Sequence, residues 1–288
     1  DRDPHFGCVI LHAVLLPGTK DVSTHSGHRP ATVVLLPYLP RDLEDLAEED
    51  ALLELRGRSR EVARRVLAAE PNLVLGLRRR ALERFRNKTK HARARVKEVG
   101  WDAACHELFV EALGLGGNRA PMSELARTHP PEEMLILGLD ALYMEKCGRW
   151  RLRGLRPAGH PHRRLGQYLE LYRRRPNWRA HLRDWVLALP SSPLVSARRR
   201  LIDEVFACLL SDGRADTLCI NALLPLLQDA RHSMDRSWLD WPPGHHPDDI
   251  QDARGLVGLT GAARNWEVQG ILDVLRRSMN ETEPTAKA

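Results

Sequence analysis

The pattern of hydrophobic and polar positions predicts two short strands followed by a long series of helices. Residues 6–16 and 31–36 are rich in Val, Ile and Leu and are flanked by Pro and Gly, which is typical of strands. Residues 17–30 contain several Gly and Ser residues and predict a loop between the strands. The fold class that we expect is α+β, mostly α, with a small N-terminal sheet and about ten helices after it.

Residues 76–99 carry the clearest helical pattern. Apolar or small side chains recur there at steps of three or four residues, which places them in one stripe along a helix. These residues are Leu82, Phe85, Thr89, Ala92, Val96 and Val99. Similar patterns predict helices over residues 41–55, 59–69, 102–113, 121–127, 131–147, 163–174, 178–189, 196–210, 216–228, 248–259 and 265–279. We also expect Asp102 to be a helix N-cap and residues 238–247 to be a loop.

The same pattern divides the chain into three parts. Residues 1–40 are predicted to be the remnant of a sheet region, residues 41–279 a helical domain and residues 280–288 a disordered tail. The chain enters a predicted strand within its first eight residues and begins without Met or a signal-peptide pattern, so we expect a fragment that lacks its original N-terminus. The apolar runs are far shorter than the about 20 residues that cross a bilayer, so we expect no membrane partner. Five cysteines without C-x-x-C spacing indicate reduced thiols and a cytoplasmic protein.

Charge is distributed in blocks along the chain. Residues 56–100 hold 15 Lys or Arg and 4 Asp or Glu, a net charge of +11, and residues 149–200 hold 14 and 2, a net charge of +12. Residues 41–55, 101–148 and 201–288 are acidic, and the whole chain carries +6. Basic blocks of this size indicate a surface for an anion such as nucleic acid. A second interpretation stays open, because an Arg bias with only six Lys also follows from a GC-rich genome.

The motifs of the common nucleotide-binding and hydrolytic enzymes do not occur, since the sequence has no G-x-S-x-G, P-loop, G-x-G-x-x-G or H-E-x-x-H. Asp3 and His12 lie on the first predicted strand and its entry, where a carboxylate and an imidazole can bind a metal ion or act in acid–base catalysis. A divalent metal ion is the cofactor that this pattern suggests. The alternative is that His12 is a hydrogen-bonded core histidine.

A second group of candidate residues surrounds the start of the helix predicted over residues 163–174. A helix N-terminus attracts anions, and arginines interleaved with aromatic rings suit the binding of phosphates or single strands. The candidates for phosphate or nucleic-acid binding are Arg156, His160, His162, Arg163, Arg164, Arg173, Arg174 and Trp178. The alternative places the aromatic rings in the core and the arginines in solvent.

Several short motifs resemble those of an uncharacterised bacterial family, a domain of unknown function. Residues 2–14 are similar to the family's H-R-D-P-x-Y-x-x-V-x-L-H-V-V stretch, with Phe6 in the place of the Tyr. Residues 112–122 resemble its A-L-G-Y-x-x-N-x-x-P-F motif, and residues 156–165 resemble its R-P-x-N-x-P-x-R-R-L motif, in which the family's Asn is not matched. The resemblance spans nearly the whole chain, although each motif is short.

The resemblance implies that a further strand with acidic and histidine residues precedes this fragment. Together with Asp3 and His12, such a strand would resemble the metal-binding sheet of restriction-nuclease-like enzymes. Our first hypothesis is therefore a nucleic-acid-associated protein, the remnant of a metal-dependent nuclease. In it Asp3 binds the metal, His12 binds the metal or orients water, and the arginines at 156, 163 and 164 hold phosphate. The alternative is a non-enzymatic interaction or scaffold module whose acidic and basic helices pair within the fold or with partners.

Overall fold

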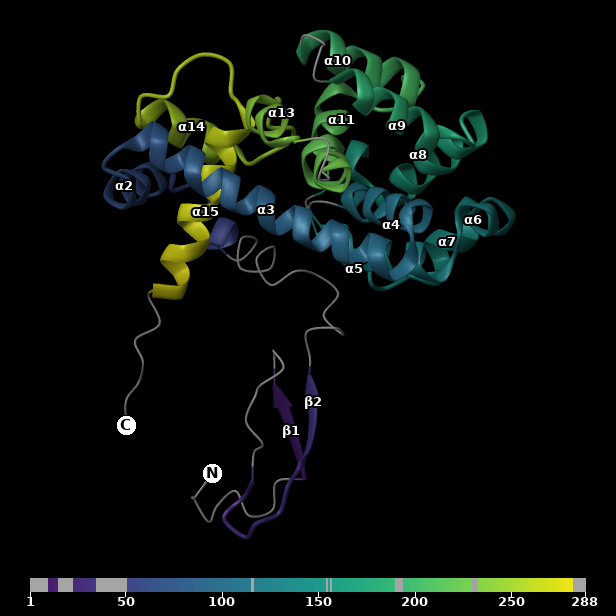
Figure 1. Cartoon of the computed structure of the whole chain (residues 1–288), viewed down its shortest axis with the longest axis horizontal. Coiled ribbons are helices and arrows are strands. Elements are labelled where there is room, and N and C mark those ends of the chain that lie inside the picture. Colours follow the sequence, from purple (N-terminus) through teal and green to yellow (C-terminus); the bar gives the residue numbers. More distant parts are fainter. Residues whose placement is uncertain are drawn as a thin grey trace. The chain divides into compact units, whose positions relative to one another are not determined.

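The computed structural model describes residues 10–14, 23–34, 51–114, 117–153, 155, 157–189, 194–228 and 233–281. Contacts divide the chain into two units, Asp1–Asp42 and Leu43–Ala288, which are both drawn in Figure 1. The fold is α+β and mostly α, as the pattern predicts. No helix in the described ranges is long and apolar enough to cross a membrane.

The first unit contains the predicted sheet. Strands β1 (Leu11–Val14) and β2 (Ala31–Val34) run parallel, with Leu11 paired to Ala31 and Val14 to Val34. Because the two strands run in the same direction, the chain between them must cross back from the end of β1 to the end of the sheet at which β1 began. The end of this connection turns tightly, since the hydroxyl of Thr24 donates a hydrogen bond to the carbonyl of His28 at 3.2 Å. The two strands are confirmed within these bounds.

Of the helix predicted over residues 41–55, the structure describes residues 51–55, and residues 51–54 are helical. Six helices follow in the first half of the second unit. They are α2 (Ser59–Ala69), α3 (Leu73–Val99), α4 (Trp101–Leu113), α5 (Arg119–Thr128), α6 (Pro131–Leu137) and α7 (Leu139–Glu145).

The second half of this unit continues the helical array and includes two π-helical turns, η5 and η6. Its elements are η3 (Pro157–Gly159), α8 (Pro161–Arg174), α9 (Trp178–Ala188), α10 (Leu194–Arg200), η5 (Leu201–Val205), α11 (Asp212–Leu218), η6 (Cys219–Leu223), α12 (Leu224–Leu227), α13 (Asp235–Asp240), α14 (Asp248–Leu256) and α15 (Asn265–Glu281).

Helix α3 is the longest element and packs along the predicted stripe. Phe85, Thr89 and Ala92 are buried, and the other stripe residues are partly buried against the same core. Helices α15, α13, α12 and α4 all contact α3, which therefore links the beginning and the end of the second unit (Figure 1). The stripe prediction is confirmed.

Helices α3 and α15 approach each other closely at a glycine. A Cβ atom on Gly270 of α15 would lie 2.6 Å from the carbonyl oxygen of Leu77 on α3. Such a distance is far shorter than van der Waals contact, so only glycine lets the two backbones come this near. The neighbouring Leu77 and Ile271 are fully buried, so the crossing lies inside the core.

A buried carboxylate fastens the same two helices. Asp273 is fully buried and accepts hydrogen bonds from Arg80 of α3 at 3.2 Å and from Arg276 and Arg277 of α15 at 2.7 and 2.8 Å. Burial acts to raise the pKa of this carboxyl, but the bonds from the guanidinium groups outweigh burial and lower it below its ordinary value. The carboxylate therefore stays charged at neutral pH and joins α3 to α15 through ion pairs.

Two predicted helix boundaries are wrong, and glycine accounts for both. Helix α4 begins at Trp101 with Gly100 as its N-cap at a φ of 84°, whereas Asp102 was expected to be the cap. The helix predicted over residues 131–147 is two helices, α6 and α7, because Gly138 has a φ of 81° and interrupts the hydrogen bonding. Glycine reaches this left-handed region without steric strain, and it ends helices for that reason.

Two further predictions need correction. The helix predicted over residues 196–210 passes from α10 into η5 and then stops, because Ala207 and Cys208 adopt φ values of 48° and 57°. The predicted loop over residues 238–247 begins within α13, where Trp238 is fully buried and donates a hydrogen bond from its ring nitrogen to the carbonyl of Ile220. The first residues of the predicted loop, residues 238–240, are therefore helical, and the ring of Trp238 is buried there.

The replacement Gly270→Ala tests the close crossing of α3 and α15. We expect it to lower the free energy of unfolding by about 1–3 kcal/mol, because the added methyl group forces the two backbones apart. Urea unfolding followed by circular dichroism measures the change. Gly255→Ala in α14 is the matched control, since a Cβ there meets nothing within 4 Å. Equal stability of both variants and the original chain would contradict the packing described here.

Candidate nucleic-acid interface

Four of the predicted phosphate-binding residues meet at the start of α8. His160 is the N-cap of this helix, and His162, Arg163 and Arg164 occupy its first turn. Arg156, which belongs to the same prediction, lies outside the described residues. The short helix η3 precedes this turn and brings the carbonyl of Ala158 next to it.

An arginine from another helix completes this group. The side chain of Arg214, on α11, donates hydrogen bonds to the carbonyl of Ala158 at 2.7 Å and to Gln167 at 2.8 Å. Arg164 donates to the same carbonyl of Ala158 at 3.1 Å. We call Arg163, Arg164 and Arg214 the α8 cation cluster. Within the described part of the chain, none of these three cations has a carboxylate partner.

Like charges within the α8 cation cluster repel one another. Burial, followed by the like charges of Arg214 and Arg163, lowers the pKa of the Arg164 guanidinium to about 10. Burial and the charge of Arg163 also lower the pKa of Arg214. Both groups remain cations at neutral pH, and an anion placed between them would relieve the repulsion.

The helix N-terminus adds to the positive potential of the cluster. Proline occupies the first position of α8, and the amide groups of His162 and Arg163 in the first turn have no side-chain cap. The helix is 14 residues long, so its dipole places partial positive charge at this end. Uncapped amides and unbalanced guanidinium groups thus lie at one end of α8.

Aromatic and imidazole rings pack beside this turn. Tyr143 of α7 stacks on Trp150 at a centroid distance of 5.6 Å with an interplanar angle of 4°. His160 and His162 lie against the same tyrosine at 5.6 and 5.3 Å. The Nε2 atom of His162 is 2.9 Å from a carboxylate oxygen of Asp140, so one acid lies close to the turn. These contacts hold the two histidines in fixed positions.

The remaining predicted members of this interface differ in environment. Arg173 and Arg174 are more than half exposed, and both pair with Glu170 at 2.6 Å, so one carboxylate partly balances them. Trp178 corrects the prediction of a base-stacking ring. Its side chain is fully buried and packs on Phe109 at 4.9 Å. A ring without exposed surface is not accessible to a base, because its apolar face completes the core instead.

The predicted metal site involves the first unit. Asp3 lies outside the described residues, and His12 is a partly buried residue of β1. The Nδ1 atom of His12 is enclosed and has no hydrogen-bond partner among the described residues. The described ranges contain no group of three or more His, Cys, Asp or Glu side chains with the geometry for a metal ion. The metal-binding and catalytic roles of Asp3 and His12 stay predictions.

Acids elsewhere in the fold pair with several arginines of the first basic block. Arg65 lies 4.0 Å from Glu54, and Arg78 lies 3.8 Å from Asp240. Arg80 also contacts Glu70, in addition to the buried Asp273. These acids belong to the segments 41–55 and 201–288 and to the basic block itself. Ion pairs inside the fold are what the interaction-module hypothesis predicts.

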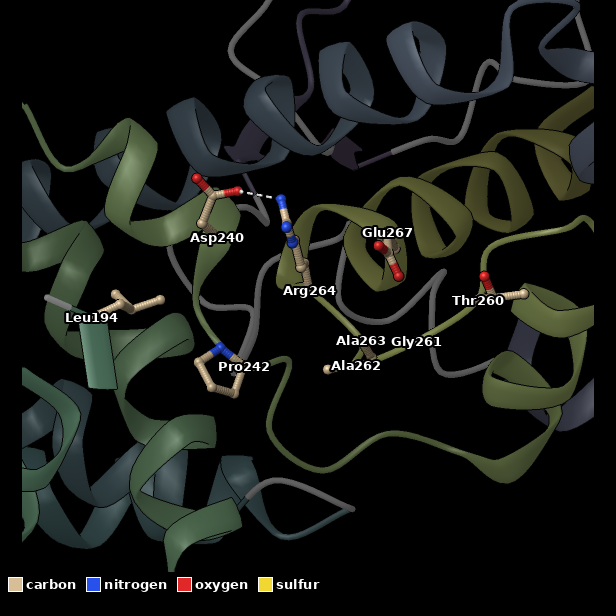
Figure 2. Close-up of a pocket in the computed structure, with 9 residues that line it drawn as sticks. All are labelled: Leu194, Asp240, Pro242, Thr260, Gly261, Ala262, Ala263, Arg264 and Glu267. Carbon is tan, nitrogen blue, oxygen red and sulfur yellow. Dashed lines mark ion pairs between the residues drawn. The ribbon is translucent and has the colours of Figure 1, made fainter. Parts of the chain in front are cut away.

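A cavity of about 510 Å³ lies apart from these residues, between α13 and the loop before α15 (Figure 2). The side chains of Asp240 and Arg264 form an ion pair of 3.6 Å at its edge. Glu267, which also lines the cavity, is bound by the buried Arg254. Each charged group that lines the cavity therefore has a partner of opposite charge, and none of the predicted site residues lines it.

Comparisons with protein-family models, with curated proteins and with solved structures found no match to this chain. The resemblance to a bacterial family therefore stays a prediction that rests on the short motifs.

Sequence reasoning missed two residues of this site. Arg214 lies in an acidic segment, 56 positions after Ala158, so neither block charge nor spacing indicated that it joins α8. Tyr143 lies in the middle of a short amphipathic segment, and no local signal distinguished it from an ordinary core residue. Both become neighbours of α8 only through the packing of α7 and α11.

A histidine side chain connects the helices that support this turn. His129, at the end of α5, contacts Glu133 through Nδ1 at 2.8 Å and Glu145 of α7 through Nε2 at 2.7 Å. A carboxylate only accepts hydrogen bonds, so both contacts are hydrogen bonds at the same time only when both ring nitrogens carry a proton and the ring is an imidazolium. Burial acts to lower the pKa of His129, but the bonds to the two carboxylates outweigh burial and raise it.

The raised pKa of His129 predicts a dependence of stability on pH. The stabilisation is fully present below the unfolded-state pKa of about 6.5 and is lost as pH rises through the folded-state value. We expect His129→Gln to lower Tm at about pH 6, with an effect of at most about 1 kcal/mol for each solvent-screened pair, and to lower it less as pH rises. Thermal unfolding between about pH 5 and 9 measures this.

The control for this measurement is His181→Gln. His181 is exposed and makes no ion pair in the described part of the chain, so its replacement should not change the pH dependence. A Tm loss in His129→Gln that is constant across the pH range, or that grows with pH, would contradict the imidazolium bridge.

Proposed function

We propose that this chain binds nucleic acid by holding backbone phosphates at the α8 cation cluster. The observation that carries the proposal is the convergence of Arg164 and Arg214 on one carbonyl, with Arg163 beside them and no carboxylate partner among the described residues. Guanidinium groups match phosphate oxygens in geometry and form charge-assisted hydrogen bonds with them. The uncapped amides at the start of α8 offer further donors to the same phosphate.

The expected mode of binding does not depend on base sequence. The donors of the cluster contact phosphate, which positions a nucleic acid but carries no sequence information. Trp178 is buried, so no base can stack on that ring in the proposed binding mode. Electrostatic contacts to phosphates weaken as salt rises, because binding releases condensed counterions.

The nuclease part of the hypothesis adds a metal site in the first unit. Asp3 and His12 would supply a carboxylate and an imidazole, which suit a divalent metal ion that activates water. The Nδ1 atom of His12 is enclosed and has no hydrogen-bond partner among the described residues, which supports the binding of a polar partner at this position. Binding at the α8 cation cluster does not require this site, so the two parts of the hypothesis are tested separately.

The second candidate function is a non-enzymatic helical interaction module. The ion pairs of Arg65, Arg78 and Arg198 with acidic residues elsewhere in the fold favour it. Such pairs use basic residues to assemble the helices, and a protein built in this way need not bind a polyanion. The arginines of the α8 cation cluster distinguish the two candidates, since pairing within the described part of the fold leaves them without a carboxylate.

A binding measurement with a single-stranded oligonucleotide tests the proposed function. We expect weak binding without sequence preference, and a log–log dependence on salt with a slope of about −0.7 for each phosphate neutralised. The variant Arg163→Gln/Arg164→Gln/Arg214→Gln should weaken binding and reduce the slope by about 2, because three cations are lost. Fluorescence anisotropy over a range of salt concentrations measures both quantities.

The matched control removes the same charge from arginines that have partners. Arg64, Arg199 and Arg200 are surface residues, each paired with an acid three or four positions away on the same helix or its continuation. Changing all three to Gln should alter the slope far less than the cluster variant does. Absence of binding by the original chain at about 50 mM salt, or equal effects of the two triple variants, would overturn the proposal.

A further inference from the structure

A row of exposed basic residues runs along the outer face of α3. Arg86, Lys90, Arg93 and Lys97 are exposed and follow one another at steps of four, three and four residues. At 3.6 residues per turn they fall within an arc of about 60° and span about 16 Å along the helix axis. We call these four residues the α3 basic stripe. Around the helix axis, the centre of this arc lies about 110° from the buried Phe85 and about 130° from the buried Ala92.

The other basic residues of α3 have partners within the fold. Arg95 is bound by Glu98 and Glu107, and Arg84 donates to Gln269 at 3.0 Å. Lys88 donates to Asn221 at 3.1 Å. One helix therefore carries two populations of cations, those with partners elsewhere in the fold and those of the α3 basic stripe.

The α3 basic stripe has no acidic partners among the described residues. Arg86, Lys90 and Lys97 make no ion pair or side-chain hydrogen bond in the described ranges. Arg93 donates to the backbone carbonyl of Gln228 at 3.2 Å, which leaves its charge unbalanced. The two acids of α3, Glu83 and Glu98, are already bound by Arg277 and Arg95. Four like charges on one helix face destabilise the isolated protein, and a polyanion would relieve their repulsion.

From this arrangement we infer that the α3 basic stripe is a second contact surface for the sugar-phosphate backbone of nucleic acid. This inference rests on the proposed function and extends it from one phosphate site to two surfaces. The cations follow one another at rises of about 4.5 to 6 Å along a rigid helix, so successive phosphates of an extended backbone can each meet one of them. The side chains are long and exposed, so they adjust to the spacing of the phosphates.

Salt-dependent binding of three proteins tests this inference. They are the original chain, the stripe variant Arg86→Gln/Lys90→Gln/Lys97→Gln and the cluster variant Arg163→Gln/Arg164→Gln/Arg214→Gln. Arg93 is kept, because its bond to Gln228 also contributes to the fold. The probes are single-stranded and double-stranded oligonucleotides of about 20 nucleotides or base pairs, and a single strand of about five nucleotides. Circular dichroism and Tm show whether each variant folds like the original chain.

We expect the stripe variant to reduce the salt slope by about 2 on the longer single strand and to have little effect on the short one. The comparison with duplex shows which form of the backbone occupies the stripe. The control for net charge is again the variant in which Arg64, Arg199 and Arg200 are changed to Gln. If the stripe variant behaves like this control on the longer single strand and on duplex, the inference is overturned.

The two proposals fail in different ways. An unchanged slope in the stripe variant, with a reduced slope in the cluster variant, would leave the proposed function in place and remove the stripe. The reverse result would place the binding surface on α3 and remove the α8 cation cluster from the proposed function. Absence of binding by the original chain to every probe would overturn both.

Discussion

The carboxylate of Asp273 is the constraint on which the second unit depends. It is fully buried between α15 and α3, and the guanidinium groups of Arg80, Arg276 and Arg277 surround it. A buried charge is tolerated only when its partners stay in place, since removing one partner of such a pair typically costs about 3–5 kcal/mol. The ion pairs of Asp273, together with the close approach at Gly270, determine how α15 packs on α3. It thereby decides which side of α3 is covered and which side, carrying the basic stripe, faces outward.

Basic residues in this protein therefore do two different things. Some assemble the fold, as Arg80 does at Asp273 and as Arg198 does at Asp216 across α10 and α11. Others carry charge that nothing in the described part of the chain balances, as in the α8 cation cluster and the α3 basic stripe. A net charge counted over a block of sequence does not separate these two groups. The three-dimensional distribution of partners does, and it locates the proposed binding of phosphate on the unbalanced cations.

Much of the fold could be predicted from local patterns, because apolar spacing reports directly on the buried face of a helix. Examples are the apolar stripe of α3, which includes Phe85 and Ala92, and the strands β1 and β2. Breaks caused by backbone conformation, as at Gly138 and Ala207, were missed, since apolar spacing continues across them. The first turn of α8 was found from its arginines and histidines, whereas Arg214 joins it only through tertiary packing. Trp178 illustrates the opposite error, because an aromatic ring among arginines has the same sequence pattern whether it is exposed or in the core.

The central claim is that nucleic acid contacts the unbalanced cations and not the paired ones. The most direct measurement is ultraviolet cross-linking of a bound single-stranded oligonucleotide, followed by mass spectrometry of the modified peptides. The account predicts adducts on peptides from the start of α8, from α11 around Arg214 and from the outer face of α3 between Arg86 and Lys97. Adducts confined to α2, α10 and α15, where exposed arginines are paired with acids, would contradict it.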